Sequence, residues 1–223
     1  MKKYFVSFCF LLVANIFAHA QNNSIAPFQD EINAFAKADS VEKPITNSIL
    51  FVGSSSFNYW KDIKAYFPGY PIINRGFGGS SLTDVIYFSK AIILKYHPKQ
   101  IYIYCGENDF AANDTITPQI VFNRFKTLYK IIRTNLGEKI PVMYVSIKPS
   151  VARWNLEPRF VAANQLIQDY LATQKNAHLL DVHHAMLDEN GQVFKDIFIA
   201  DNLHMNAKGY RIWQKIIAPT LIN

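Results

Sequence analysis

The chain has 223 residues, of which half are apolar and 18% are charged. This composition is typical of a globular protein and excludes a disordered or fibrous one, and the length suits one domain with a sizeable core. The formal net charge is +6, but no run of basic residues is longer than two. Nucleic-acid binding needs a clustered basic stripe, so we expect no nucleic-acid partner.

The first twenty residues have the pattern of a secretory signal peptide. Lys2 and Lys3 precede the apolar run 4–17, and Ala18 and Ala20 supply the small side chains that a signal peptidase reads. The apolar run is shorter than the ~20 residues that a membrane-spanning helix needs. We therefore expect cleavage after Ala20, export to the periplasm or the medium, and no membrane span.

Cleavage after Ala20 would leave a single cysteine, Cys105. One cysteine cannot form an internal disulfide, so the fold must be stable on its core alone. Because Cys105 closes the apolar run 101–105, we interpret it as a buried residue and not as a nucleophile.

The rest of the chain divides into a polar lead-in at 21–47, with one short amphipathic helix, and a domain at 48–223. Continuous apolar runs predict strands buried on both faces at 49–52, 70–74, 101–105, 142–147 and 179–182. Helical periodicity predicts helices at 82–96, 120–132, 158–171 and 207–217. This alternation predicts an α/β fold in which helices cover both faces of a parallel sheet.

Chemistry in such sheets gathers in the loops after the carboxyl ends of the strands. Three polar or glycine-rich loops follow predicted strands, at 53–56, 76–81 and 106–109, and a fourth at 201–204 precedes the last helix. A real active site should therefore draw its residues from these loops.

The last loop offers an acid and a base. Asp201 and His204 are three residues apart on a turn that enters a helix, so the carboxylate can accept from the imidazole Nδ1–H and leave Nε2 as a base. A serine hydroxyl is a poor nucleophile without such a base, and three serines, 54–56, lie on the sharp turn after the first strand. Taken alone, the pair could be a surface contact or cap, and the serines 54–56 a polar turn.

The second and third loops offer hydrogen-bond donors for an oxyanion. The glycines of loop 76–81 let the backbone approach a substrate closely, and Asn108 of loop 106–109 offers a side-chain amide. Each such donor is worth roughly 10²–10³ in rate. Taken alone, each loop is an ordinary turn.

Together, four blocks resemble the SGNH, or GDSL-type, hydrolases. The blocks are Gly53-Ser54-Ser55, Gly78-Gly79, Gly106-Glu107-Asn108-Asp109 and Asp201-x-x-His204, with flanking matches in 74–79 and 204–210. They occur in the family's order and span nearly the whole chain after residue 20. The resemblance implies a three-layer α/β/α sandwich with a five-stranded parallel sheet, which is a flavodoxin-like fold.

The resemblance also implies roles for individual residues. Ser55 matches the nucleophile, and Asp201 and His204 match the acid and base of the triad. The oxyanion hole is implied to consist of the Ser55 N–H, the Gly79 N–H and the Asn108 amide, with no cofactor. Ser54 stands where the family usually has Asp, which leaves the bracing of that turn to be explained.

Other polar and aromatic residues near the predicted loops have weaker interpretations. Arg153 and Trp154 follow the fourth strand and could bind a sugar ring or an acyl chain, or could simply flank a helix. We interpret the aromatic residues of 57–60 as core packing of the first helix. Asp181, His183 and His184 raise the question of a metal, but adjacent residues at a strand end point in opposite directions, so we expect no metal site.

The substrate implied by the resemblance is a carboxylic ester. Export and the lack of a long lid insertion favour a small acyl group, such as acetyl, on a carbohydrate. A lysophospholipase or an esterase resembling platelet-activating-factor acetylhydrolase is the alternative, and a glycan-binding protein without catalysis is a third.

Two other interpretations, an α/β-hydrolase and a nucleotide-binding module, fit the sequence less well. An α/β-hydrolase would have Gly-x-Ser-x-Gly, whereas position 57 is Phe. A dinucleotide-binding loop would need glycine at position 81, which is Ser.

Overall fold

The computed structural model describes residues 27–223, so the predicted signal peptide lies outside the described residues. Its five strands are β1 (Ile49–Gly53), β2 (Ile72–Gly76), β3 (Gln100–Tyr104), β4 (Val142–Val145) and β5 (Ala177–Leu180). All neighbouring strands pair in parallel, in the order β2-β1-β3-β4-β5. The flavodoxin-like sheet and its parallel pairing confirm the predicted fold class.

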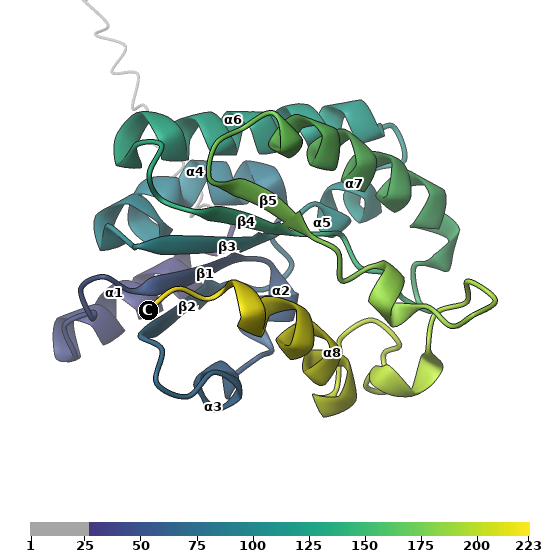
Figure 1. Cartoon of the computed structure of the whole chain (residues 1–223), viewed down its shortest axis with the longest axis horizontal. Helices are drawn as coiled ribbons and strands as arrows, with labels where there is room; N and C mark the ends of the chain where they lie inside the picture. The colour runs from purple at the N-terminus through teal and green to yellow at the C-terminus, as the bar shows by residue number, and fades with distance from the viewer. Residues whose placement is uncertain (1–26) are drawn as a thin grey trace, which may run out of the picture.

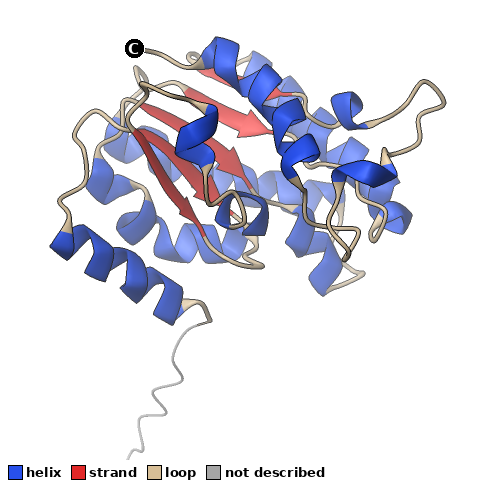
Figure 2. Ribbon diagram, turned by 90° about the horizontal axis from the view of Figure 1, so that it is seen from below, coloured by secondary structure: helices blue, strands red, loops and turns tan. Residues whose placement is uncertain are grey.

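Helices cover both faces of this sheet, as Figures 1 and 2 show. The first face carries α4 (Leu82–Ile92), α5 (Glu107–Ala112), α6 (Pro118–Leu136) and α7 (Glu157–Ala172), with α1 (Gln29–Val41) against α4. The second face carries α2 (Ser55–Asn58), α3 (Ile63–Tyr66) and α8 (Ala207–Ile217). Short 3-10 helices lie at Leu94–Tyr96, Trp154–Leu156, His184–Met186, Lys195–Ile197 and Ala218–Thr220.

The alternation of strand side chains creates two apolar clusters, one under each helical layer. Leu50 and Val52 point into the cluster below α4, α6 and α7, whereas Ile49 and Phe51 point into the cluster below α2 and α8. The helices present matching apolar stripes, as when Tyr210, Trp213 and Ile217 of α8 are all buried. Among residues 27–223, no helix is long and apolar enough to cross a membrane.

The ends of all five strands differ by one or two residues from those of the apolar runs, and local hydrogen bonds explain two of these ends. β2 begins at Ile72, because the Ile72 N–H donates to the Tyr70 carbonyl in a local turn. β5 ends at Leu180, because the N–H groups of residues 182 and 183 donate to the Ser146 hydroxyl. Hydrogen bonds outside the ladder therefore set these ends, and hydropathy alone could not locate them.

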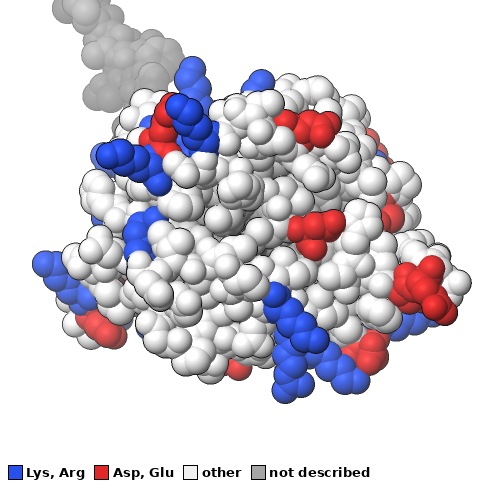
Figure 3. Space-filling model, viewed as in Figure 1, with Lys and Arg blue, Asp and Glu red and all other residues white. Residues whose placement is uncertain are grey.

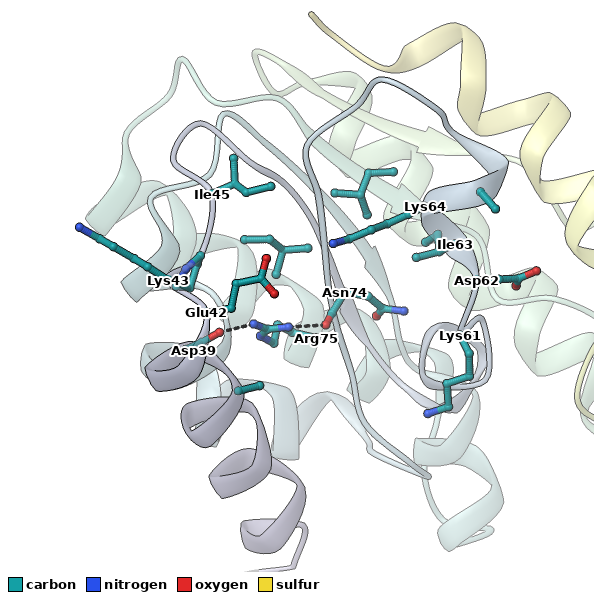
Figure 4. Close-up of a pocket in the computed structure, with 15 residues that line it drawn as sticks. Asp39, Glu42, Lys43, Ile45, Lys61, Asp62, Ile63, Lys64, Asn74 and Arg75 are labelled. Atoms are coloured by element: carbon teal, nitrogen blue, oxygen red, sulfur yellow. Dashed lines mark hydrogen bonds and ion pairs between the residues drawn. The ribbon is translucent and has the colours of Figure 1, made fainter.

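Polar contacts attach α1 to the β2 edge of the sheet. Asp39 of α1 pairs with Arg75 of β2 and, at 2.5 Å, with the Lys95 ammonium, while the Tyr96 hydroxyl donates to Asp39 at 2.6 Å. Figure 4 shows the Asp39–Arg75 contact at the wall of a cavity of about 510 Å³. The cavity is lined by residues of 38–45, 61–65 and 72–75 and includes no residue of the loops at 53–56, 106–109 or 201–204.

Basic and acidic side chains are interspersed on the face seen in Figure 3. Lys and Arg form small separate groups there, and Asp and Glu lie beside several of them.

The sharp turn after β1 depends on Gly53, so we predict that Gly53→Ala destabilises the protein strongly. Gly53 has φ +137°, and a Cβ there would lie 1.9 Å from the Tyr104 carbonyl oxygen of β3. Gly69→Ala is the matched control, because Gly69 also has positive φ (+85°) but nothing lies within 4 Å of the Cβ that alanine would add. We expect about 1 kcal/mol of destabilisation for the control and more than ~3 kcal/mol for Gly53→Ala, measured by denaturant unfolding. Equal losses would contradict the steric argument.

Candidate active site

The order of the strands brings two of the predicted loops to one place. β1 and β3 are neighbours, and the chain leaves them toward opposite sides of the sheet, which makes the crevice beyond their carboxyl ends a topological switch point. Ser55 follows β1 closely, and Asn108 lies in the first turn of α5, just after β3. The two side chains therefore converge at the position where this fold binds ligands.

Ser55, His204 and Asp201 form a hydrogen-bonded chain. His204 Nε2 lies 2.9 Å from Ser55 Oγ, and His204 Nδ1 lies 2.6 Å from Asp201 Oδ2. The His204 side chain is 15% exposed, and that of Asp201 is 41% exposed. Although burial alone would raise the pKa of Asp201, the hydrogen bonds from His204 and Leu203 hold that pKa below its usual value. The carboxylate therefore stays ionised and can stabilise a positive imidazole.

The Asp201–His204 turn is fixed by its own backbone. Asp201 Oδ1 accepts from the N–H groups of Leu203 and His204, both at 2.9 Å, and Asn202 adopts the left-handed region with φ +56°. Asn206 then caps α8 by accepting from the Lys208 N–H at 2.8 Å. These contacts hold His204 at the start of a helix whose apolar face is packed on the sheet.

Contacts between α8 and the serine turn set the position of the base relative to the nucleophile. The Tyr210 hydroxyl of α8 donates to the Ser56 carbonyl at 2.9 Å. Tyr59 stacks on the His204 imidazole, with ring centroids 4.2 Å apart and planes 12° apart.

The sequence predicted that the aromatic residues of 57–60 pack in the core. For Tyr59 this prediction is wrong. Phe57 and Trp60 are fully buried, but Tyr59 is 50% exposed. The reason is helical geometry, because residue 59 lies four positions after Ser55 and so shares its face of the turn.

Two of the three predicted oxyanion donors are backbone N–H groups, at Ser55 and Gly79. Gly79 has φ +66°, which favours glycine, and within residues 27–223 neither the Ser55 N–H nor the Gly79 N–H donates to a protein acceptor. Both donors are therefore available to a bound oxyanion.

The Asn108 amide is held from two sides. Its Nδ2 donates to Ser54 Oγ at 2.6 Å and to the Ser80 carbonyl at 3.1 Å, while its Oδ1 accepts from Arg153 at 2.9 Å. The Ser54 N–H in turn donates to the Tyr104 carbonyl at 2.8 Å. Backbone contacts thus brace the serine turn without the acidic side chain that the family usually has there, and the Ser54 hydroxyl contacts Asn108 instead.

A buried charge cluster lies directly behind Asn108. Glu107 pairs with Lys148 at 3.2 Å and with Arg153 at 3.1 Å, and it accepts from the Tyr104 hydroxyl at 2.6 Å. Burial would raise the pKa of Glu107, but the two cations and the tyrosine hydroxyl lower it overall, so the carboxylate is charged. Lys148 is fully buried, and this burial lowers its pKa against the opposing attraction of Glu107.

Glu31 of α1 is a site neighbour that the sequence did not reveal. Its carboxylate accepts from the Gly78 N–H at 3.0 Å and from the Asn58 amide at 3.1 Å. Phe28, just before α1, packs edge-on against Phe77 with ring centroids 5.3 Å apart. The lead-in helix therefore supports the glycine loop, and only a long-range contact could have shown this.

The remaining predicted positions lie apart from the triad's hydrogen-bond chain. Trp154 is partly buried and packs against the apolar cluster below α2 and α8, and Cys105 is fully buried, which raises the pKa of its thiol. His183 is buried and its Nε2 faces Glu157 at 2.6 Å, whereas the exposed His184 pairs with Asp181 at 2.5 Å. The two imidazoles thus have separate carboxylate partners.

Comparisons with known proteins identify the family and agree with the fold. The model of the GDSL-like lipase/acylhydrolase family matches residues 48–212. The chain belongs to this family of ester-hydrolysing enzymes. No curated protein matched the sequence.

Three solved structures share the fold. A Streptococcus pneumonia protein, provisionally described as a platelet activating factor, is 19% identical with a TM-score of 0.75, covering 87% of this chain and 92% of its own. A GDSL-like lipase from Bacteroides thetaiotaomicron is 18% identical with a TM-score of 0.71, covering 85% and 96%. A catalytic mutant of an acetylxylan esterase from Geobacillus stearothermophilus is 11% identical with a TM-score of 0.61, covering 79% and 95%. At these identities the likeness shows the fold.

We predict that Glu107→Gln destabilises the protein by about 3–5 kcal/mol at neutral pH, because it leaves the Lys148 ammonium buried without its partner. The double variant Glu107→Gln/Lys148→Met removes both charges and should recover much of this loss. The measurement is denaturant unfolding of the three proteins, and a Glu107→Gln variant within about 1 kcal/mol of the unchanged protein would contradict the buried pair.

The same pair predicts a pH dependence of stability. Because the pKa of Glu107 is lowered in the folded state, its ionisation stabilises the fold above the ordinary glutamate pKa of about 4.5, and this contribution is lost as pH falls through the folded-state value. The free energy of unfolding of the unchanged protein should therefore fall relative to that of the double variant as the pH drops from neutral to about pH 3. A constant difference across that range would contradict the shift.

Proposed function

We propose that this protein is an exported serine esterase that hydrolyses small acyl esters on carbohydrates. The observation that carries the proposal is the chain from Ser55 Oγ to His204 Nε2 at 2.9 Å and from His204 Nδ1 to Asp201 at 2.6 Å. It occurs at the switch point of a fold whose family hydrolyses esters. The signal-peptide pattern of residues 1–20 supports export.

The mechanism begins when His204 Nε2 takes the Ser55 proton as Ser55 Oγ attacks the ester carbonyl carbon. The resulting oxyanion accepts from the Ser55 N–H, the Gly79 N–H and the Asn108 amide, which exchanges its contact with the Ser54 hydroxyl for one with the oxyanion. The bond to the alcohol then breaks, and the alcohol leaves with the proton from His204. Water attacks the acyl-enzyme by the same steps and releases the acid and free Ser55.

The exposure of the site supports a substrate that projects a short acyl group. Ser55 is partly exposed, and Asp201 and Tyr59 beside it are 41% and 50% exposed. A long acyl chain gains its binding energy by burial in an apolar pocket, whereas an acetyl group on a polymer needs only an accessible nucleophile. The similarity in fold to an acetylxylan esterase supports a carbohydrate substrate. A lipid ester is the alternative substrate, because the Streptococcus pneumonia protein described as a platelet activating factor has the same fold.

We predict that Ser55→Ala removes nearly all hydrolysis of p-nitrophenyl acetate, with a loss of at least ~10³ in kcat, because the nucleophile is gone. Ser56→Ala is the matched control, since Ser56 is its neighbour but is buried and lies outside the triad. It should retain kcat within about threefold. Full activity in Ser55→Ala would disprove the assignment.

The acyl preference can be tested with p-nitrophenyl esters of two to twelve carbons. We expect kcat/KM to be greatest for acetyl and to fall at least ~10-fold by eight carbons, because a partly exposed site offers a long chain little surface to bury in the transition state. A preference for chains above eight carbons would instead favour the lipid esterase. Release of acetate from acetylated xylan then tests the carbohydrate directly.

A further inference from the structure

The side-chain amide of Asn108 ends in an oxygen and an NH2 group, which have similar shapes. The oxygen accepts hydrogen bonds, whereas the NH2 group donates them. The oxyanion role requires the N–H end to face the serine turn. In the structure Nδ2 is 2.6 Å from Ser54 Oγ and 3.1 Å from the Ser80 carbonyl, and Oδ1 is 2.9 Å from the Arg153 guanidinium. The contacts that select this orientation therefore determine whether the Asn108 N–H can donate to the oxyanion.

Two of the three neighbours can form hydrogen bonds in only one sense. The Ser80 carbonyl accepts only, and the Arg153 guanidinium donates only, whereas the Ser54 hydroxyl can do either. If the amide rotated by half a turn, Oδ1 would face the Ser80 carbonyl and Nδ2 would face a cation. Both contacts would then become repulsive, so Arg153 and the Ser80 carbonyl together allow one orientation.

Arg153 is itself held by protein contacts at its Nη1. Its Nη1 lies 3.1 Å from Glu107 Oε1, and Glu107 is anchored by Lys148 and the Tyr104 hydroxyl. The side chain of Arg153 is only 21% exposed. The contacts thus run from the buried Glu107–Lys148 pair through Arg153 to the Asn108 amide.

We propose that Arg153 is a positioning residue, which acts through Asn108 by holding the side-chain amide with its N–H toward the oxyanion. This role replaces the substrate-binding role that the sequence suggested for Arg153, and it rests on the proposed esterase function. In the reaction, the oxyanion takes the place of the Ser54 hydroxyl as the acceptor of this N–H, while Arg153 and the Ser80 carbonyl keep the amide plane in place.

The test is a double-mutant cycle on p-nitrophenyl acetate, a substrate with no charge for Arg153 to bind. Arg153→Met removes the donors and should lower kcat about tenfold while KM changes less than about twofold. In an Asn108→Ala background, which alone should cost about 10²-fold, Arg153→Met should cost less than about twofold more. Arg153→Lys keeps a cationic donor and should restore part of the lost kcat.

Arg159→Met is the matched control. The Arg159 side chain is 24% exposed, close to the 21% of Arg153, but it donates to the carbonyls of Asp114 and Ile116. It should leave kcat unchanged. A raised KM with unchanged kcat in Arg153→Met would restore the substrate-binding role, and an equal loss in both backgrounds would show that Arg153 does not act through Asn108. Either result overturns the proposal.

A second readout does not require activity. In ¹⁵N-labelled protein, the Asn108 side-chain amide protons should exchange slowly with solvent, and faster in Arg153→Met but not in Arg159→Met. If the unchanged protein hydrolyses no ester, the proposed function fails, and this readout alone decides whether Arg153 holds the amide. Equal exchange in the two arginine variants would overturn that role, even in an active enzyme.

Discussion

The 2.9 Å contact between His204 Nε2 and Ser55 Oγ joins residues that lie 149 positions apart. The turn after β1 and the packing of α8 bring these two residues into contact. Ser55 is fixed by the turn after β1, where Gly53 lies against the β3 backbone. His204 is fixed by the Asx contacts of its own turn and by the packing of α8, whose Tyr210 hydroxyl binds the Ser56 carbonyl. Two elements from opposite ends of the chain are thus held together on one face of the sheet.

A second constraint is the buried charge behind the oxyanion donors. A fully buried ammonium such as that of Lys148 is costly unless a carboxylate compensates it, and Glu107 does so at 3.2 Å. Such a pair adds little net stability compared with apolar residues. It does fix the orientation of the side chains around it, because a carboxylate only accepts hydrogen bonds and an ammonium only donates them. The Glu107–Lys148 pair holds Arg153, and Arg153 holds Asn108. Stability and preorganisation of the site are therefore coupled at one cluster.

Much of the fold could be predicted from the sequence because it depends on local patterns. Continuous apolar runs indicate parallel strands, and the predicted helix 207–217 coincides with α8 because Asn206 caps it and its apolar stripe is strong. Four short blocks indicated the family, and the family match confirms it. The roles of Ser55, Asp201 and His204 stay predictions, which the geometry supports.

What the sequence could not reveal depends on contacts between distant segments. Glu31 reaches the Gly78 N–H across 47 positions, and nothing in the local pattern of α1 distinguishes it from a solvated glutamate. The sequence left open whether Arg153 binds a substrate or simply flanks a helix, and only the structure shows its carboxylate and amide partners. Burial of Lys148 was hidden for the same reason, because its partner Glu107 is 41 positions away.

The central claim is that Ser55 is the nucleophile activated by His204, and covalent capture tests it most directly. The protein would be treated with a fluorophosphonate, which phosphonylates activated serines, and its peptides analysed by mass spectrometry. We predict one adduct, located on Ser55, that is absent after His204→Ala. An adduct on Ser54 or Ser56, or labelling that is unaffected by His204→Ala, would contradict the account.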